Sequence, residues 1–338
     1  MATIKDIAKK VGLSVTTVSR ALNGYDDVSE KTRKKIQLAA AELKYSPNVA
    51  ARSLVTNRTQ TIGLLVSGLN QEGAKDHFMF DILNGLNHKA SNAGYDLVLF
   101  STDSAKQRVK SYTQLCRERR VDGVILQGIR LDDPYLQEII ESDIPCVVID
   151  IPVRSSKVGH VTTDNRQGAK KAVDYLLQHG HKQIAFMNGH GQAHVSQERL
   201  LGYQDALQEA ALTVTQALIY NGEFSEYKAE VEALKLFKAK PEATAVFCAS
   251  DLMALGVMKA AKRMRLRVPE DVSIIGFDNI TLAEYVNPGL TTISQEPFQM
   301  GIEACAILLS LLTGEETSKQ SILPTTLIER ESVAFVRS

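Results

Sequence analysis

The N-terminal segment contains two short helical patterns separated by a tight turn, and this spacing constrains the fold more than any other feature. Thr3 and Asp6 stand three residues apart, as in a capping box, and apolar residues follow at helical spacing. Gly12 is suited to end this first helix, and Ser14 to cap a second helix over residues 15–22. Two short helices joined by such a turn predict a helix-turn-helix unit, whose second helix enters the DNA major groove.

The second helix has an apolar side and a polar side. Val18, Ala21 and Leu22 can face a small core, which leaves the remaining side chains for a partner. Hydroxyl side chains reach phosphates or base edges, Val15 can contact a thymine methyl group, and Arg20 can form two hydrogen bonds with guanine. A three-helix protein-interaction domain with a polar face is the alternative interpretation.

A third helix is expected over residues 30–43, with Ser29 as its cap. Its apolar side is expected to contain Ile36, Leu38, Ala39, Ala40 and Leu43. Together the three helices would form one small headpiece.

Charge is unevenly distributed, although the whole chain carries 39 basic and 39 acidic residues. Residues 1–58 contain eleven Lys or Arg and five Asp or Glu, whereas the other 280 residues contain 28 basic and 34 acidic ones. A basic head on an acidic body indicates that only the head meets a polyanion. A solvated basic face would produce the same count, so charge alone is weak support.

Residues 3–24, TIKDIAKKVGLSVTTVSRALNG, and YSPNVAARSL at 45–54 resemble the lactose/galactose repressor family. The similarity continues in order through VDGVILQG (121–128), HGHKQIAFMNG (179–189), TAVFCASDLMALG (244–256), VPEDVSIIGFDN (268–279), LTTISQ (290–295) and LIERES (327–332). The resemblance implies a sequence-specific DNA-binding transcriptional regulator. It also implies repression of genes for carbohydrate use on a palindromic operator, under the control of a small sugar-like effector.

The segment after the headpiece is expected to act as a hinge. Pro47 stands just inside a helix start, with Ser46 as the cap. The helix expected over 48–55 is too short to be stable alone in water, so we expect it to fold only against DNA or a partner subunit. The resemblance implies that this helix pairs with its twin and inserts Leu54 into the minor groove at a central CG step. An ordinary exposed linker residue is the alternative for Leu54.

The predicted DNA-binding residues of the headpiece and hinge share small, polar or wedge-forming side chains. They are Thr3, Ser14, Val15, Thr16, Thr17, Ser19, Arg20, Asn23, Ser29, Asn48, Ala51 and Leu54.

From residue 61 onward, apolar runs alternate with helical patterns. The strand-like runs occur at 62–66, 97–100, 123–126, 146–149, 184–187, 245–248 and 272–277, with helical stretches between them, as at 80–93 and 166–179. Unbroken apolar strands separated by helices indicate parallel sheets covered on both faces. We therefore expect an all-α helix-turn-helix headpiece and an α/β core of two doubly wound parallel-sheet lobes. The resemblance implies a periplasmic-binding-protein-like core whose chain crosses between the lobes three times.

The expected domains are 1–45 for the headpiece, 46–59 for the hinge and linker, and 60–338 for the effector-binding and dimerisation core. By the resemblance, one lobe combines about 60–160 with 293–322, and the other combines about 161–292 with 323–338.

Candidate effector-binding residues follow the expected strands, because open α/β sheets bind ligands at the carboxyl ends of their strands. Asp150 and Asp278 occupy such positions. The resemblance implies that Arg199 and Asp278 hold the effector, that Phe224 packs over its ring, and that Phe78 adds an aromatic from the opposite lobe. Alternatively, Arg199 and Asp278 could form a purely structural ion pair. Phe224 could be an ordinary core residue, and Asp150 could cap the segment that follows it.

Two positions depart from the family pattern. Ser250, a further candidate effector contact, stands where sugar-responsive members carry asparagine, which puts one ligand contact in doubt. Ala193 stands where the purine-responsive member has a base-reading arginine, which argues against a purine. The chain ends at Ser338 without the heptad extension of tetrameric members, so a homodimer on two half-sites is expected. Effector binding should change the angle between the lobes and thereby the affinity for the operator. Induction and corepression both fit the sequence.

Enzyme, metal and cofactor functions are not expected. The segment 189–191 follows a strand, as in a dinucleotide fingerprint, but His194 stands where the third glycine belongs, so a loop that lines a cleft is the better interpretation. His190 and His194 have no acidic or cysteine ligand nearby in sequence, so no metal site is expected. His179 and His181 follow a helix, where we expect surface capping.

The chain has no run of about 18 apolar residues for a membrane and no secretion signal at its N-terminus. Its four cysteines match no metal spacing, and three of them lie in apolar runs and fit buried, reduced thiols, so a cytoplasmic location is expected. A second interpretation keeps the headpiece and makes the core a platform for a protein corepressor. A solute-binding protein of a transporter is a third and less favoured interpretation.

Overall fold

The computed structural model describes residues 2–22, 25–45, 58–67, 77–102, 109–153, 155, 157–315 and 318–336. Contacts divide the chain into two units, the headpiece Met1–Thr59 and the core Gln60–Ser338. Within these described ranges, no helix is both long enough and apolar enough to cross a membrane.

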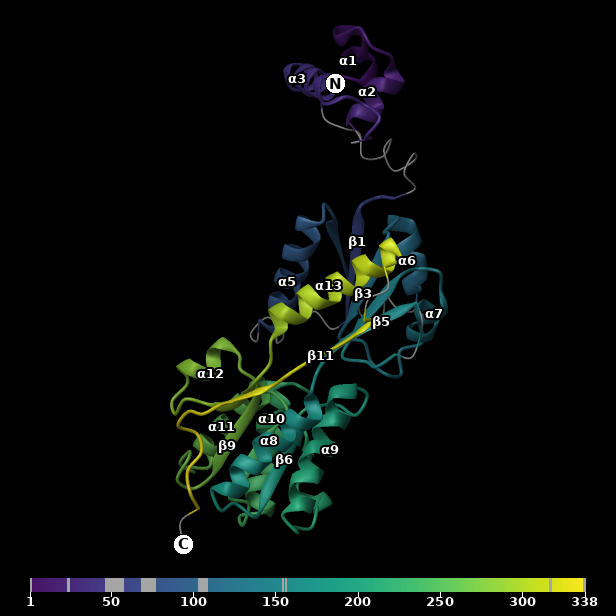
Figure 1. The fold of residues 1–338 in the computed structure, drawn as a ribbon. Coiled ribbons are helices and arrows are strands. Elements are labelled where there is room, and N and C mark those ends of the chain that lie inside the picture. Colours follow the sequence, from purple (N-terminus) through teal and green to yellow (C-terminus); the bar gives the residue numbers. More distant parts are fainter. Residues whose placement is uncertain are drawn as a thin grey trace. The chain divides into compact units, whose positions relative to one another are not determined.

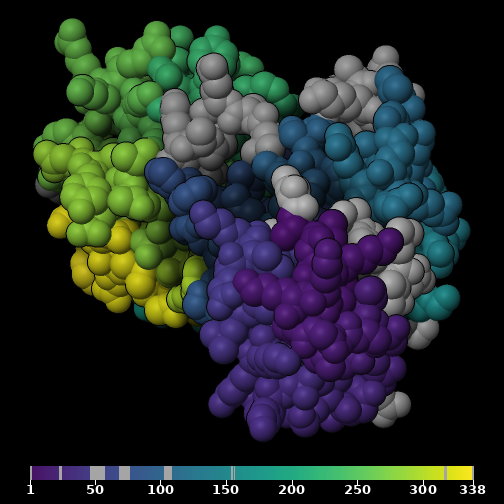
Figure 2. All heavy atoms as spheres, turned by 90° about the horizontal axis from the view of Figure 1, so that it is seen from above, coloured from purple at the N-terminus to yellow at the C-terminus, as the bar shows by residue number. Residues whose placement is uncertain are grey.

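The described residues of the headpiece contain three helices, in the unit that is coloured purple in Figure 2. They are α1 (Ile4–Val11), α2 (Val15–Leu22) and α3 (Glu30–Glu42). Ile7, Val18 and Ile36, one from each helix, are fully buried at the centre of this unit. The predicted helix-turn-helix with a third helix behind it is confirmed.

The prediction that Leu38 belongs to the apolar side of the third helix is wrong. Leu38 is 67% exposed, whereas Ile36, Ala39 and Ala40 are buried. Positions three and four residues apart share a face of a helix, but positions two apart lie on nearly opposite sides. Leu38 therefore points away from the face that begins with Ile36.

The first lobe of the core contains a six-stranded parallel sheet in the order β11-β5-β4-β3-β1-β2. Figure 1 labels β1, β3, β5 and β11 of this sheet. Its strands are β1 (Thr61–Ser67), β2 (Asp96–Thr102), β3 (Gly123–Gln127), β4 (Cys146–Ile149), β5 (Val158–Thr163) and β11 (Gln320–Leu323). Its helices are α5 (Phe78–Asn92), α6 (Tyr112–Arg119), α7 (Leu136–Glu141) and α13 (Pro297–Thr313).

Alternate residues of β1 pack into different cores. Leu64 and Val66 pack with residues of α5 and α13. Leu65 packs with residues of α6 and α7 on the other face of the sheet. Both faces of the strand are thus buried, which explains why its sequence is an unbroken apolar run.

The second lobe has a six-stranded sheet in the order β12-β10-β9-β8-β6-β7, in which the edge strand β12 runs antiparallel to β10 and the other pairs are parallel. Its strands are β6 (Ile184–Asn188), β7 (Ile219–Asn221), β8 (Ala245–Cys248), β9 (Ser273–Asp278), β10 (Thr291–Ser294) and β12 (Thr326–Ile328). Its helices are α8 (Asn165–Gln178), α9 (His194–Glu209), α10 (Glu226–Ala239), α11 (Asp251–Arg263), α12 (Thr281–Tyr285) and a 3₁₀ turn at Gln216–Leu218. The predicted architecture of two doubly wound lobes is confirmed.

The chain crosses between the lobes a few residues away from the predicted boundaries. Strand β5 belongs to the first sheet through residue 163, because Val161 pairs with Ile149. Strand β10 belongs to the second sheet, because Thr292 pairs with Gly276, so residues 293–294 are not part of the first lobe. Residue 323 also stays in the first sheet, at the end of β11. Strand register decides these points, and apolar periodicity does not reveal it.

The expectation that His181 caps a helix on the surface is wrong. Its side chain is 3% exposed, with Nδ1 2.9 Å from Oγ1 of Thr244 and Nε2 3.0 Å from the carbonyl oxygen of Ala334. Because a carbonyl only accepts, Nε2 donates, and Nδ1 accepts from the Thr244 hydroxyl. Burial lowers the pKa of His181. His179, in contrast, places Nδ1 2.8 Å from the Tyr175 carbonyl oxygen at the end of α8.

All four cysteines are buried and unpaired, which confirms the prediction for the three in apolar runs and extends it to the fourth. Burial raises the pKa of Cys116 and of Cys305 to about 12. A thiol is reactive mainly as its thiolate, so these side chains act as small apolar residues of the core.

Candidate DNA-binding surface and effector pocket

The turn between α1 and α2 is built from the residues that the sequence singled out. The backbone N–H of Thr3 donates to Oδ2 of Asp6 at 2.8 Å, and the backbone N–H of Asp6 donates to Oγ1 of Thr3 at 3.4 Å, which completes the capping box. Gly12 ends α1 in the left-handed conformation with φ 71°. Ser14 accepts from the backbone N–H of Thr17 at 3.0 Å and so caps α2.

The outer face of α2 presents small and polar groups around one arginine. Val15 is 44% exposed, and Thr16 is exposed beside it. Nη2 of Arg20 lies 2.7 Å from Oδ2 of Asp27, and its guanidinium carbon lies 4.7 Å from the centre of the Tyr25 ring. These two contacts hold Arg20 near the end of α2, and a base edge would have to replace Asp27.

The remaining predicted DNA-binding residues divide into two groups. Thr17 and Ser19 are half-buried, and Ser29 is exposed and caps α3 by accepting from the backbone N–H of Thr32 at 3.3 Å. Asn23, Asn48, Ala51 and Leu54 lie outside the described residues.

The core contains a cavity of about 240 Å³ that both lobes line. All six predicted effector-binding residues line it: Phe78, Asp150, Arg199, Phe224, Ser250 and Asp278. Strand ends explain the convergence, since Asp150 follows β4, Asp278 ends β9, and Ser250 lies two residues after β8. The carboxyl ends of the parallel strands of both sheets therefore border one cavity.

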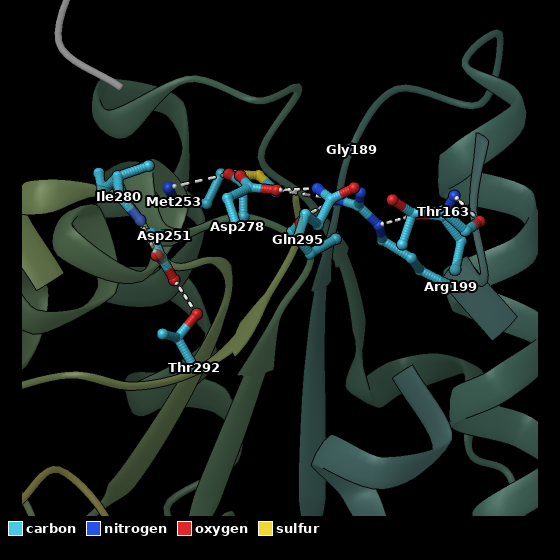
Figure 3. Close-up of polar contacts among 12 residues, drawn as sticks. Thr163, Gly189, Arg199, Asp251, Met253, Asp278, Ile280, Thr292 and Gln295 are labelled. Carbon is cyan, nitrogen blue, oxygen red and sulfur yellow. Dashed lines mark hydrogen bonds and ion pairs between the residues drawn. The ribbon is translucent and has the colours of Figure 1, made fainter. Parts of the chain in front are cut away.

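An ion pair and an amide occupy one wall of this pocket (Figure 3). Nη1 of Arg199 lies 3.7 Å from Oδ1 of Asp278, and both side chains are largely buried. Nε2 of Gln295 donates to the same Oδ1 at 2.7 Å. Arg199 also donates from Nε to Oδ1 of Asn165 at 2.8 Å and from Nη1 to the Ala249 carbonyl at 2.5 Å. Arg199 and Asp278 thus belong to one buried polar network.

A second buried carboxylate supports the turn that carries Asp278. Asp251 is fully buried at the start of α11 and accepts from the backbone N–H of Ile280 at 2.9 Å and from the Thr292 hydroxyl at 2.5 Å (Figure 3). Burial, followed by the nearby charge of Asp278, raises the pKa of Asp251. Asp251 therefore ties the turn after β9 to β10.

The opposite wall contains Asp150. Its Oδ1 accepts from the Thr162 hydroxyl at 3.0 Å, which joins the end of β4 to β5. Burial raises the pKa of Asp150, and the charge of Arg199 opposes that shift. Asp150 therefore faces the pocket instead of capping a helix.

Phe224 and Ser250 have local structural roles in addition to their place in the pocket. The ring of Phe224 lies edge-on to His190, with centroids 5.6 Å apart. A Cβ at Gly189 would overlap the Phe224 ring, so glycine is required where that ring lies. Ser250 accepts from the backbone N–H of Met253 at 3.2 Å and so caps α11.

Gln127 and Gln295 also line the pocket, and the sequence did not single them out. His190 lines it as well, as expected of the loop at 189–191, although it was not among the candidate effector contacts. Gln127 ends β3, Gln295 follows β10, and His190 follows β6. Each stands at the end of an apolar strand, so the rule that selected Asp150 could also have selected these residues. Burial lowers the pKa of His190, which favours its neutral form.

The comparisons with known proteins agree with this architecture. Residues 3–48 match the family described as bacterial regulatory proteins, lacI family, and residues 173–333 match a periplasmic binding protein-like domain. The chain is 37% identical over 322 residues to the HTH-type transcriptional repressor PurR of Vibrio vulnificus, which covers 95% of both chains. It is 36% identical over 338 residues to the PurR of Escherichia coli, which covers 99% of this chain and 97% of that one.

Solved structures show the same fold. The transcriptional regulator CelR in complex with cellobiose is 33% identical, with a TM-score of 0.77 over 98% of this chain and 100% of that one. The lac repressor dimer bound to operator and the anti-inducer ONPF is 26% identical, with a TM-score of 0.83 over 98% and 99%. The chain therefore belongs to the lacI family of bacterial regulatory proteins, and it is a DNA-binding transcriptional regulator.

Proposed function

We propose that this regulator is a repressor that binds a near-palindromic operator as a homodimer and is controlled by a small effector in the core pocket. One observation carries the proposal: six residues chosen from the sequence, from both lobes, line a single cavity of about 240 Å³. A ligand that contacts both lobes favours one angle between them, which can be transmitted to the segment before the core. A coupling of about 1–3 kcal/mol would change operator affinity about 5- to 150-fold.

The headpiece is proposed to place α2 in the major groove. The small side chains on its outer face allow close approach to base edges, and Arg20 can exchange Asp27 for guanine. The other proposed DNA contacts are Thr3, Ser14, Val15, Thr16, Thr17, Ser19, Asn23, Ser29, Asn48 and Ala51.

The hinge is proposed to form a helix on DNA and to insert Leu54 at a central CG step. Leu54→Ala should therefore reduce the preference for CG over other central steps, because the apolar wedge is shortened. Fluorescence anisotropy with operators that differ only at the central step measures this preference. An unchanged preference, or an asymmetric footprint on the operator, contradicts the hinge model.

The effector is proposed to be a small polyhydroxylated molecule, such as a mono- or disaccharide. Asp150 and Asp278 can accept from adjacent hydroxyls, and Phe78 and Phe224 can cover the apolar face of a sugar ring. The similarity to CelR, which was solved with cellobiose, supports this ligand class. The homodimer is proposed by similarity to the lac repressor, which was solved as a dimer on its operator.

A purine is the second candidate, which the similarity to repressors named PurR favours. Against it, Ala193 lines the pocket at the position where the resemblance expects a base-reading arginine. Alanine offers no hydrogen bond to a base. The neighbouring Val195 also lines the pocket with an apolar side chain.

The test is operator binding by the full chain in the presence of neutral sugars, hypoxanthine and guanine, one at a time. A sugar that shifts operator affinity and binds in calorimetry supports the proposal, and a response to hypoxanthine or guanine alone selects the second candidate. If only a phosphorylated carrier protein shifts operator affinity, the core is a protein platform and the small-effector proposal is wrong.

A further inference from the structure

Three buried polar atoms that line the pocket have no hydrogen-bond partner among the described residues. They are Oε1 of Gln127, Nδ1 of His190 and Oε1 of Gln295. Gln127 is 6% exposed and Gln295 is 5% exposed, so solvent reaches neither side chain freely. Buried polar atoms without a partner are unfavourable and rare in native proteins, and three around one cavity indicate that a ligand supplies the partners.

The orientation of the Gln295 amide follows from its neighbour. Its Nε2 donates to Oδ1 of Asp278 at 2.7 Å (Figure 3). A carboxylate only accepts, so the reversed amide would place two oxygen atoms against each other. Oε1 of Gln295 is therefore held as an acceptor on the pocket wall.

The carboxyl groups of the pocket are acceptors as well. Asp150 and Asp278 stand on walls that belong to different lobes. Thr162 donates to one oxygen of Asp150, and Gln295 donates to one oxygen of Asp278. Together with the two glutamine oxygens, these groups present acceptors from several directions, so a ligand that carries O–H or N–H donors fits the pocket best.

The positively charged side chain of the pocket, Arg199, already interacts with other groups of the protein. Among the described lining residues, Arg199 is the one with a permanent positive charge. Its Nε and Nη1 donate to Asn165 and to the Ala249 carbonyl, and its guanidinium carbon lies 3.7 Å from the centre of the Phe277 ring. The charge of Asp278 faces it at 3.7 Å. Arg199 is therefore poorly placed to neutralise a phosphate on the ligand.

Charged groups near His190 largely compensate one another. Nε of Arg130 donates to Oδ1 of Asp132 at 2.9 Å, and Lys228 forms an ion pair with Glu223. The charges of all four side chains influence the pKa of His190. Neither pair leaves an excess positive charge for an anion.

We propose that the pocket selects effectors that carry several hydrogen-bond donors and no negative charge, and that it rejects the phosphorylated form of the same compound. This inference rests on the proposed function, because it specifies the ligand class of the same pocket. It applies to a sugar and to a purine alike. A phosphate monoester carries about −1.5 to −2 charges near neutral pH, and here it would meet two carboxylates and a cation that is already paired.

The test compares neutral compounds with their phosphate monoesters on the full chain. The pairs are cellobiose and cellobiose 6′-phosphate, glucose and glucose 6-phosphate, ribose and ribose 5-phosphate, and inosine and inosine 5′-monophosphate. Thermal shift identifies binders, and calorimetry measures their affinity. We expect the neutral member of the responsive pair to bind at least about tenfold more tightly than its phosphate ester, since charge complementarity sets selectivity.

Two substitutions test the cause. Asp150→Asn removes one negative charge from the pocket. The affinity of the neutral compound divided by that of its phosphate ester should therefore fall by about threefold or more. Gln295→Leu removes the fixed acceptor and should weaken the neutral compound about tenfold. Asp143→Asn is the matched control, because Asp143 is an exposed carboxylate paired with Arg117 away from the pocket. It should leave both affinities unchanged.

A phosphate ester that binds as tightly as its neutral parent, or more tightly, overturns the inference, and so does the absence of binding by every neutral member. Measurements of operator affinity distinguish a failure of the charge-selection inference from a failure of the proposed function. If a phosphate ester binds and shifts operator affinity, the effector-controlled repressor stands and the charge selection is wrong. If no member of any pair, and neither hypoxanthine nor guanine, binds or shifts operator affinity, both are wrong.

Discussion

Several residues of the pocket have a backbone conformation that side chains other than glycine rarely adopt. Asp150 has φ 67°, Phe224 has φ 56°, and Asp278 has φ 114°. Such conformations are unfavourable and persist where surrounding contacts enforce them, which is common at functional sites. For Asp278 these contacts include the bonds that Asp251 accepts from Ile280 and Thr292.

Asp278→Ala should abolish the effector response and leave operator binding nearly intact. The substitution leaves Arg199 and the ligand without their shared partner, which costs about 1–3 kcal/mol or more. The headpiece is a separate contact unit, so DNA binding should persist. Calorimetry and an operator assay on the same preparation measure both properties. Asp143→Ala serves as control, and an effector response that survives in Asp278→Ala contradicts the assigned role.

The buried His181 should make the core less stable in mild acid. Its pKa is lowered by burial in the folded state, whereas an unfolded histidine titrates near about pH 6.5. The folded state therefore binds its proton less readily, so this stability is present above about pH 6.5 and is lost as the pH falls below that value. Between about pH 7.5 and 5, the melting temperature should fall less steeply with decreasing pH in His181→Gln than in the wild type. His88→Gln is the control, because His88 is exposed. If the melting temperature of His181→Gln depends on pH as that of the wild type does, His181 does not have this role.

Among the structural elements, the loop from β6 to α9 determines where the Phe224 ring lies. Gly189 begins this loop and leaves no room for a Cβ, which would overlap the Phe224 ring and come within 2.6 Å of the Ser196 hydroxyl oxygen. Two residues later, a Cβ at Gly191 would meet no atom within 4 Å. The two glycines of one loop therefore have different structural requirements.

Gly189→Ala should weaken effector binding, whereas Gly191→Ala should not. The added methyl group at 189 forces the Phe224 ring to move, and overpacking of this kind costs about 1–3 kcal/mol, or about 5- to 150-fold in affinity. Calorimetry with the responsive compound compares the two variants directly. Equal affinities for both variants would show that the ring position does not matter for binding.

At the scale of the whole molecule, charge divides the chain into a basic headpiece and an acidic core. Lys5, Lys9 and Lys34 are exposed on the headpiece. The core carries the acidic excess and contributes the pocket. DNA binding should therefore depend on the headpiece and on the neutralisation of phosphates.

Operator affinity should fall steeply with salt. Each phosphate that the protein neutralises contributes a slope of about −0.9 to log affinity against log salt concentration. Two headpieces that neutralise about six phosphates together should lose about a thousandfold in affinity between about 50 and 200 mM salt. Anisotropy titrations over this range measure the slope. Affinity that hardly changes would show that phosphate contacts are few.

Local chemistry in the sequence determined the helix-turn-helix, its caps and the apolar strands β1 to β4, β6, β8 and β9, because caps, turns and buried strands depend on neighbouring residues. The strands β5, β7, β10, β11 and β12 were not among the predicted runs. The sequence also indicated Asp150 and Asp278, since strand ends are visible as the ends of apolar runs. The tertiary structure alone decided how far each strand extends in its sheet, the burial of His181 and the exposure of Leu38. It also decided the orientation of the Gln295 amide and which three polar atoms of the pocket have no hydrogen-bond partner among the described residues. These features depend on contacts between residues far apart in sequence, such as His181 with Ala334, and such pairs leave no periodic pattern in a single chain.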